Sequence, residues 1–395
     1  MSTSLERPAG ADPFPAREDA LAGMGQERRT TPVELLWDLV FVFAVTQVTT
    51  LLSKELTWAG FGRSMLVLAL VWWAWSAFVW AANAQSKDSL VLRYVLLAAT
   101  VCIFIAGIAL PHAFAGKATL FAAAYAAVRG LHLLLYADAS RRGNAAWSAI
   151  AGFAVTVAVG MALLVAGSFL SEGPRLALWG VAAAIDYAGP GWLTRGRLRG
   201  LQRVAVAHFS ERYGLFVIIA LGESIVAIGV RTRTAHQDAQ EIVAVTLCLL
   251  ITIGLWWTYF DRFAAHAEGR LRSAREPVLA AADAYSYLHL VVVAGIIVFA
   301  VGARLVVGGG ALSTAGWLAL CGGIALYFAG LVGARWRLLG SVDALKVLAA
   351  LVLLALGVAA PAVAPWGAAA IVTGVLTAVC AADAIRLGSR PDDSR

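Results

Sequence analysis

The sequence contains few charged residues for its length. Charged side chains make up 14% of the 395 residues, hydrophobic residues make up 61%, and the mean hydropathy is +0.78. Soluble domains carry about 25% charged residues, so this composition argues against a soluble domain and predicts a polytopic membrane protein. The net charge of +7 follows the loops of the predicted membrane topology, as shown below, and therefore indicates no nucleic-acid partner.

Cysteine is rare, and its placement argues against a metal or redox centre. The four cysteines all fall in apolar runs without CxxC or Cys/His spacing, which predicts buried, inert thiols at Cys102, Cys248, Cys321 and Cys380. The sequence also lacks GxxxxGKS/T, HExxH and GxSxG motifs. It therefore gives no support to phosphate-loop, zincin or serine-hydrolase chemistry. We expect no cofactor, and we assign no metal ligand and no catalytic residue.

The first 30 residues lack the apolar core of a signal peptide. They are polar, contain three prolines and carry charges of both signs. We expect residues 1–30 to remain as a disordered cytoplasmic tail, and residues 388–395 to form a second, shorter cytoplasmic tail.

Long apolar runs are what the sequence has in abundance. A helix needs about 20 apolar residues to cross a bilayer. Short connections with proline, at Pro111 and between Pro361 and Pro365, separate neighbouring runs. We expect an all-α membrane bundle with twelve spans, near residues 32–52, 63–83, 90–111, 118–138, 147–170, 174–193, 208–230, 241–264, 280–306, 314–333, 342–361 and 366–386.

The distribution of basic residues orients these spans. If the N-terminus is cytoplasmic, the cytoplasmic segments contain 22 of the 31 Lys and Arg residues and the external loops contain 7. Cytoplasmic loops of membrane proteins are enriched in Lys and Arg. The split therefore predicts a multi-pass protein of the bacterial plasma membrane, in contact with the lipid bilayer, with both termini cytoplasmic.

The two halves of the chain show similar features in the same order. ELLWDLVFV at 34–42 opens the first span and ERYGLFVII at 211–219 opens the seventh, and a tryptophan pair follows each of them one span later. Asp186 and Asp383 occupy similar places in the sixth and twelfth spans. We predict two parallel six-helix repeats with a site between them near the midplane. They comprise residues 31–193 and 208–387 and are joined by a basic cytoplasmic linker at 194–207.

Two longer segments around these openings carry a family resemblance. ELLWDLVFVFAVTQ at 34–47 and HFSERYGLFVIIALGES at 208–224 closely resemble the two signature segments of the bacterial low temperature requirement protein A family. The resemblance extends over nearly the whole chain from about residue 30. It departs at Leu36 and Trp37, where the family usually has two phenylalanines. It implies a bacterial multi-pass membrane protein linked to growth in the cold, and it implies no reaction, substrate or catalytic residue.

Glu223 is an acid within the apolar run 215–229. It lies roughly 18 Å along the helix from Glu211. Insertion scales make a charge at the bilayer centre unfavourable by about 2.5–3.5 kcal/mol, so Glu223 should face a protein interior or a wet cavity. It is either a protonated, hydrogen-bonded structural carboxyl or, with Ser224, part of an ion or substrate path. We expect it between the two repeats, opposite Arg129 or Asp186.

Arg129 lies in the middle of the fourth span, and His132 follows one turn later on the same face. Because arginine stays charged at any working pH, an acid must compensate it, and Glu223 and Asp186 are the candidates. Asp186 precedes Pro190 by four residues, where a proline ring breaks the helical hydrogen bond and kinks the span. A binding site and a purely structural ion pair are both consistent with this pattern.

Glu34 and Asp38 open the first span. Thr31, Pro32 and Glu34 have the spacing of a capping box with proline at the first helical position. Asp38 lies one turn further on the same face, where a cap needs no second acid. Glu211 either starts its own helix or pairs with His208 or Arg212.

Five tryptophans lie away from the interfaces where tryptophan usually gathers in membrane proteins. They either wall a cavity or pack within the bundle, and they are Trp72, Trp73, Trp75, Trp256 and Trp257. Their position alone does not assign them a ligand.

Three functions fit these residues. The leading hypothesis is a secondary transporter or permease for a small molecule or ion. Ionisable residues near the midplane suit proton coupling. Glu223 would bind the proton or a cationic group, Arg129 would set the pKa of Glu223 or hold an anionic group, and Asp38 and Asp186 would line the inner path. The alternatives are an intramembrane enzyme acting on a lipid or polyprenyl substrate, which no motif supports, and a membrane-embedded sensor or assembly factor for cold or envelope stress.

The predicted topology can be tested by cysteine labelling. Single cysteines introduced near Gly143 and near Arg270, in a chain without its native cysteines, should react with an impermeant reagent only from the cytoplasmic side. Both positions lie in connections that the basic residues assign to the cytoplasm. Labelling of either position from outside would contradict the twelve-span topology.

Overall fold

The computed structural model describes residues 30–85, 89–143, 146–193, 195–196, 205–231 and 238–388. Over these ranges the secondary structure is helical, and none of the described residues lies in a strand. Apart from Thr30 and Gly388, the predicted tails lie outside the described residues, as does most of the predicted linker at 194–207.

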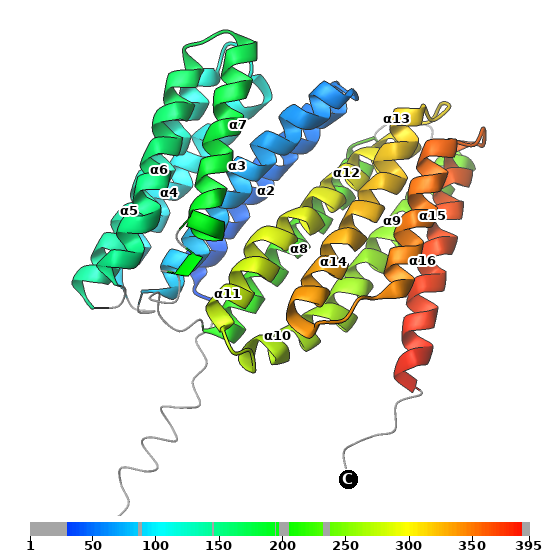
Figure 1. Ribbon diagram of the computed structural model, residues 1–395. Coiled ribbons are helices and arrows are strands. Elements are labelled where there is room, and N and C mark those ends of the chain that lie inside the picture. Colours follow the sequence, from blue (N-terminus) through cyan, green and yellow to red (C-terminus); the bar gives the residue numbers. More distant parts are fainter. Residues whose placement is uncertain are drawn as a thin grey trace, which may run out of the picture.

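A first group of helices covers the N-terminal half of the chain and forms one side of the bundle (Figure 1). α7 continues as the π-helical turn η2 (Gly189–Leu193), at the place where Pro190 predicts a kink. The helices of this first group are α2 (Pro32–Lys54), α3 (Trp58–Asn83), α4 (Leu90–Ala109), α5 (Ala118–Arg141), α6 (Trp147–Ser168) and α7 (Glu172–Ala188).

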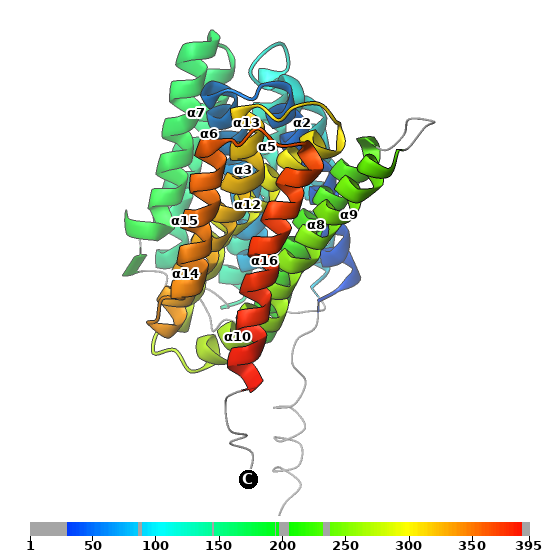
Figure 2. The same cartoon turned by 90° about the vertical axis from the view of Figure 1, so that its right-hand side faces the viewer.

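A second group covers the C-terminal half and lies beside the first (Figures 1 and 2). Its main helices are α8 (Val206–Arg231), α9 (Ala239–Tyr259), α12 (His289–Val307), α14 (Gly323–Leu339), α15 (Ala344–Ala359) and α16 (Pro365–Gly388). Three short helices extend them through π-helical turns. These are α10 (Ala265–Arg272) after η4 (Phe260–Ala264), α11 (Pro277–Ala281) before η5 (Ala282–Leu288), and α13 (Thr314–Trp317) before η6 (Leu318–Gly322).

Ten helical segments in the described part of the chain are long and apolar enough to cross a membrane. An all-α polytopic membrane bundle is therefore confirmed. α7 and α15 contain 17 and 16 residues, fewer than the roughly 20 that cross a bilayer, although η2 lengthens α7. The count of twelve spans stays a prediction.

The neighbours within the two groups follow the same order. In the first group α2 packs against α4, α4 against α5, and α5 against α6. In the second group α8 packs against α12, α12 against α14, and α14 against α15. A duplicated six-helix unit would produce this order, although the repeat itself stays a prediction.

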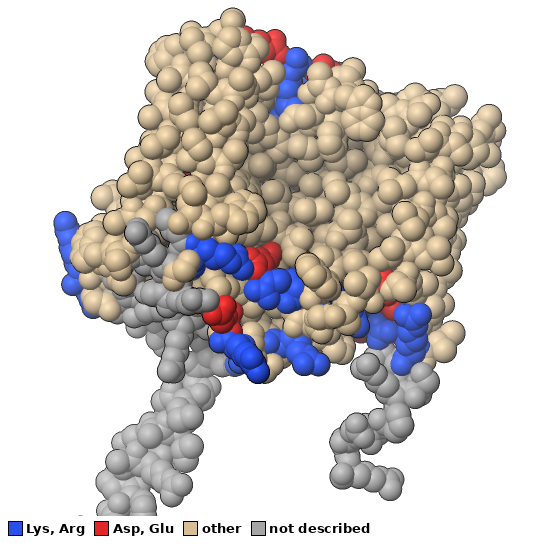
Figure 3. Space-filling view, in the orientation of Figure 1, with Lys and Arg blue, Asp and Glu red and all other residues tan. Residues whose placement is uncertain are grey.

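Charge is concentrated at one end of the bundle. α2 begins and α16 ends at this end (Figures 1 and 2), and most of the Lys and Arg side chains visible in Figure 3 gather there. The sides of the bundle carry exposed apolar residues such as Val155 and Leu351 instead. This distribution is typical of a protein whose sides face lipid.

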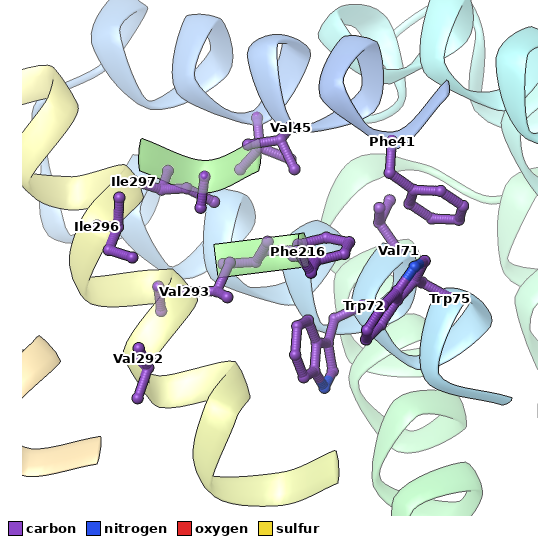
Figure 4. Close-up of a cluster of buried hydrophobic side chains, with 14 of the residues drawn as sticks. Phe41, Val45, Val71, Trp72, Trp75, Phe216, Val292, Val293, Ile296 and Ile297 are labelled. Carbon is purple, nitrogen blue, oxygen red and sulfur yellow. The ribbon is translucent and has the colours of Figure 1, made fainter. Parts of the chain in front are cut away.

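Buried aromatic and aliphatic side chains fill the boundary between the two groups (Figure 4). Trp72 and Trp75 of α3 pack on Phe216 of α8, with ring centroids 5.1 and 4.4 Å apart. These two tryptophans therefore pack at the boundary between the groups. Trp256 and Trp257 are 43% and 41% exposed, so neither walls a buried cavity.

Glycine brings α12 and α14 into close contact. A Cβ atom at Gly295 would lie 2.3 Å from the backbone nitrogen of Tyr327, and one at Gly323 would lie 2.3 Å from that of Phe299. Small residues allow this approach in membranes, where helices associate through van der Waals packing and interhelical hydrogen bonds. The second group is therefore tightly packed around these two helices.

Gly295→Ala tests this contact. Its Cβ would meet backbone atoms that cannot rotate away, so the helices must separate, at a cost of about 1–3 kcal/mol. We expect a lower melting temperature in detergent. The matched control is Gly322→Ala in η6, where a Cβ has no neighbour within 4 Å. Equal melting temperatures for the two variants would contradict the close packing.

Candidate functional site

An ionic cluster joins the two groups through α2 and α8. Arg212 donates a hydrogen bond to Asp38 over 2.6 Å, and its other terminal nitrogen lies 3.2 Å from a carboxylate oxygen of Glu34. His208 Nε2 lies 3.2 Å from the same Glu34 oxygen. Each of these four residues is at most 3% exposed. The two acids predicted at the start of the first span therefore form one buried cluster with two basic residues.

Local structure holds both acids in place. The other carboxylate oxygen of Glu34 accepts hydrogen bonds from the backbone N–H and the hydroxyl of Thr31, each over 2.8 Å. Glu34 thus caps α2, as its spacing predicts, and also takes part in the ionic cluster. The indole N–H of Trp75 donates to Asp38 over 2.7 Å. The Asp38 carboxylate is therefore held by α3 as well as by Arg212 of α8.

The role expected for Glu211 is wrong. It is exposed and lies inside α8, which begins at Val206, so it does not start the helix. Its expected partners His208 and Arg212 contact α2 instead. The sequence does contain a signal for them. His208 and Arg212 are four residues apart, as are Glu34 and Asp38, and this spacing puts each pair on one helix face.

Glu223 lies about two thirds of the way along α8 and is 2% exposed. The hydroxyl of Thr46 in α2 donates a hydrogen bond to its carboxylate over 2.5 Å, and Arg304 of α12 lies close enough to attract its charge. The expected position opposite Arg129 or Asp186 is therefore wrong. Its neighbour Ser224 is fully buried, and the Ser224 hydroxyl has no hydrogen-bond partner in the described part of the chain.

Arg129 and Asp186 pair with each other inside the first group. Arg129 Nη2 donates to Asp186 over 2.8 Å, and the two side chains are 2% and 8% exposed. Both line a cavity of about 60 Å³. Its other walls come from α3, α5, α6, η2 and η5, and include Trp73, Trp80, His132, Tyr136, Ser286 and Tyr287. Of the predicted site residues, Arg129, Asp186 and His132 therefore share one cavity.

The polar side chains of this cavity have hydrogen-bonding capacity to spare. Nε and Nη1 of Arg129 and Nδ1 of His132 are buried, with no hydrogen-bond partner among the described residues. Leaving a buried donor unsatisfied costs about 1–3 kcal/mol. A cavity of 60 Å³ has room for roughly four waters or a small solute. These atoms are therefore suited to bind the acceptor atoms of such molecules.

The end of α7 positions Asp186 in this wall. Tyr187, the next residue, donates its hydroxyl to the carbonyl of Ala69 in α3 over 2.8 Å, and its ring stacks on Trp73 with centroids 4.0 Å apart. Tyr287 of η5 donates to the carbonyl of Tyr187 over 2.8 Å. Contacts with α3 and with the second group thus hold the chain directly after the acid.

A separate ionic cluster lies inside the second group. Lys346 Nζ donates to Asp343 and to Asp383 over 2.8 Å each, and Arg262 lies 3.6 Å from Asp383. Asp383, like Asp186, is thus a buried acid, but it has two basic neighbours, and one of them, Lys346 of α15, also pairs with Asp343.

Long apolar helices around buried ion pairs define a multi-pass integral membrane protein. The chain belongs to the bacterial low temperature requirement A protein (LtrA) family, whose model matches residues 29–381. This confirms the resemblance of the two signature segments. An uncharacterized protein of Rhizobium meliloti (strain 1021) is 32% identical over 276 residues, which cover 68% of this chain and 67% of that protein. No solved structure matches the chain significantly.

Arg212→Met tests the cluster between α2 and α8. The change leaves Glu34 and Asp38 buried without their arginine, and removing one partner of a buried ion pair costs about 3–5 kcal/mol. We expect a much lower melting temperature in detergent. Adding Glu34→Gln and Asp38→Asn should restore most of it, because no unpaired carboxylate then remains.

The matched control removes a surface pair. Arg142 is 53% exposed in its pair with Asp138, so Arg142→Met should change stability by less than about 1 kcal/mol. If Arg212→Met melts no lower than this control, the cluster does not stabilise the contact between the groups.

Proposed function

We propose that this protein is a secondary transporter, or permease, that moves a small solute through the cavity between its two helix groups. One observation carries the proposal. The cavity around Arg129 and Asp186 is lined by helices of the first group and by Ala282, Ser286 and Tyr287 of η5 in the second group. Alternating access needs a binding site shared by two units that can move against each other.

Polar contacts between the groups suit the role of gates. The cluster of Glu34, Asp38, His208 and Arg212 lies near the ends at which α2 and α8 begin. The Thr46–Glu223 hydrogen bond joins the same two helices nearer their other ends. Rocking of one group against the other would open one of these contacts while the other held.

Buried acids at both ends also suit proton coupling. An acid that loses its basic partner during such a movement keeps an uncompensated charge, which protonation removes. Glu34, Asp38 and Glu223 are the residues that we assign to this role. We place both termini in the cytoplasm because the basic residues divide 22 to 7, and growth in the cold is the process in which we expect transport to matter.

Ala77→Cys tests alternating access without knowledge of the substrate. Ala77 lines the cavity. In a chain without native cysteines, an impermeant thiol reagent should modify this cysteine in right-side-out and in inside-out vesicles, because the cavity opens to each side in turn. The control Ala74→Cys, one turn earlier on α3 and fully buried, should stay unmodified in both. Modification of Ala77→Cys from one side only would contradict the proposal.

A further inference from the structure

We infer that the cavity binds a small carboxylate on Arg129, and that Asp186 takes up a proton as the carboxylate displaces it. The inference rests on the proposed function for its role in transport. Binding and proton uptake can be measured without transport.

Arg129 provides the first argument. A guanidinium has five N–H donors in a fixed plane that matches the geometry of a carboxylate. Asp186 accepts from Nη2, whereas Nε and Nη1 have no hydrogen-bond partner in the described part of the chain. Arg129 is 1% exposed and lines the cavity. An acceptor-rich anion in the cavity would satisfy donors that the described residues leave open.

Charge balance provides the second argument. Arg129 and Asp186 form a neutral pair, so an entering carboxylate would leave one uncompensated negative charge in a buried site. A proton on Asp186 removes that charge and releases Arg129 to the ligand. The reaction consumes one proton from the side on which the carboxylate enters and forms the neutral acid of Asp186.

The surrounding titratable groups leave Asp186 as the site of this proton. They are His132, Tyr125 and Tyr136 of α5, Tyr187 beside Asp186, and Tyr287 of η5. α3 contributes the indoles Trp73 and Trp80, and α6 contributes the apolar residues Phe153 and Val157. A proton on His132 would put a second cation beside Arg129. The tyrosines are already protonated in their ordinary neutral form.

The size and walls of the cavity define the rest of the ligand. A volume of 60 Å³ suits a solute of roughly four to six non-hydrogen atoms. Aromatic and aliphatic side chains also line the cavity, among them Trp80, Phe153 and Val157. A short apolar tail would therefore lie against these side chains while the carboxylate meets Arg129. Propionate has this form.

Calorimetry on the purified full chain in nanodiscs tests the inference. Propionate should bind with uptake of close to one proton, shown by the dependence of the heat on the ionisation enthalpy of the buffer. Propionamide, which has the same shape without the charge, should bind at least ten times more weakly. Equal binding of the two, or binding of propionate without proton uptake, would overturn the inference.

Variants separate the contribution of Arg129 to binding from that of Asp186 to proton uptake. Asp186→Asn should bind propionate at least ten times more tightly and without proton uptake, because Arg129 then has no competing acid. The double variant Arg129→Gln/Asp186→Asn leaves no unpaired charge and should lose propionate binding while melting near the wild-type temperature. It keeps the test decisive if the single variant does not fold. Wild-type binding by the double variant would exclude Arg129 as the anion site.

The matched control changes a buried acid elsewhere. Asp383→Asn leaves Lys346 paired with Asp343, and it should bind propionate as the wild type does.

Failure of this inference can be distinguished from failure of the transporter proposal. Binding as described, with Ala77→Cys modified from one side only, would retain the carboxylate site and reject transport. Modification from both sides without propionate binding would retain the transporter proposal and reject the carboxylate site.

Discussion

A charge inside a bilayer needs a partner, and the arrangement of this bundle depends on that constraint. Burying an unpaired charge is far costlier than the modest net gain from a buried ion pair, so the helices must bring acids and bases together. Arg212 on α8 joins Glu34 and Asp38 on α2, which connects the two groups. Because lipid is as apolar as leucine, these polar contacts select the rotation of the helices more sharply than apolar packing does.

The buried ionic groups are not equivalent. Arg212 and Lys346 each have two acids as partners, so their positive charges are fully compensated. Arg129 has one acid as its partner and lines a cavity. The contrast separates ion pairs that hold helices together from an ion pair with room for a ligand, and it is the reason that our functional proposal centres on Arg129.

The helices of the second group pack more closely against one another than the two groups pack against each other. Gly295 and Gly323 bring the backbones of α12 and α14 into direct contact, so these helices cannot separate without losing a continuous interface. Between the groups, by contrast, the contacts are made by side chains, which include aromatic rings, the cluster around Arg212 and the Thr46–Glu223 hydrogen bond. Such contacts can exchange partners one at a time. The fold thus combines a rigid second group with a boundary along which movement is physically reasonable.

The sequence by itself determined the membrane bundle, the family and the cap at Glu34. It could do so because each span must satisfy its own backbone hydrogen bonds, which makes long apolar runs and helix breaks directly readable. Only the tertiary structure decided that Arg129 meets Asp186, that Glu223 meets Thr46, and that Trp256 faces outward. Position along a helix gives depth, whereas a partner depends on how each helix is rotated and which helix lies beside it.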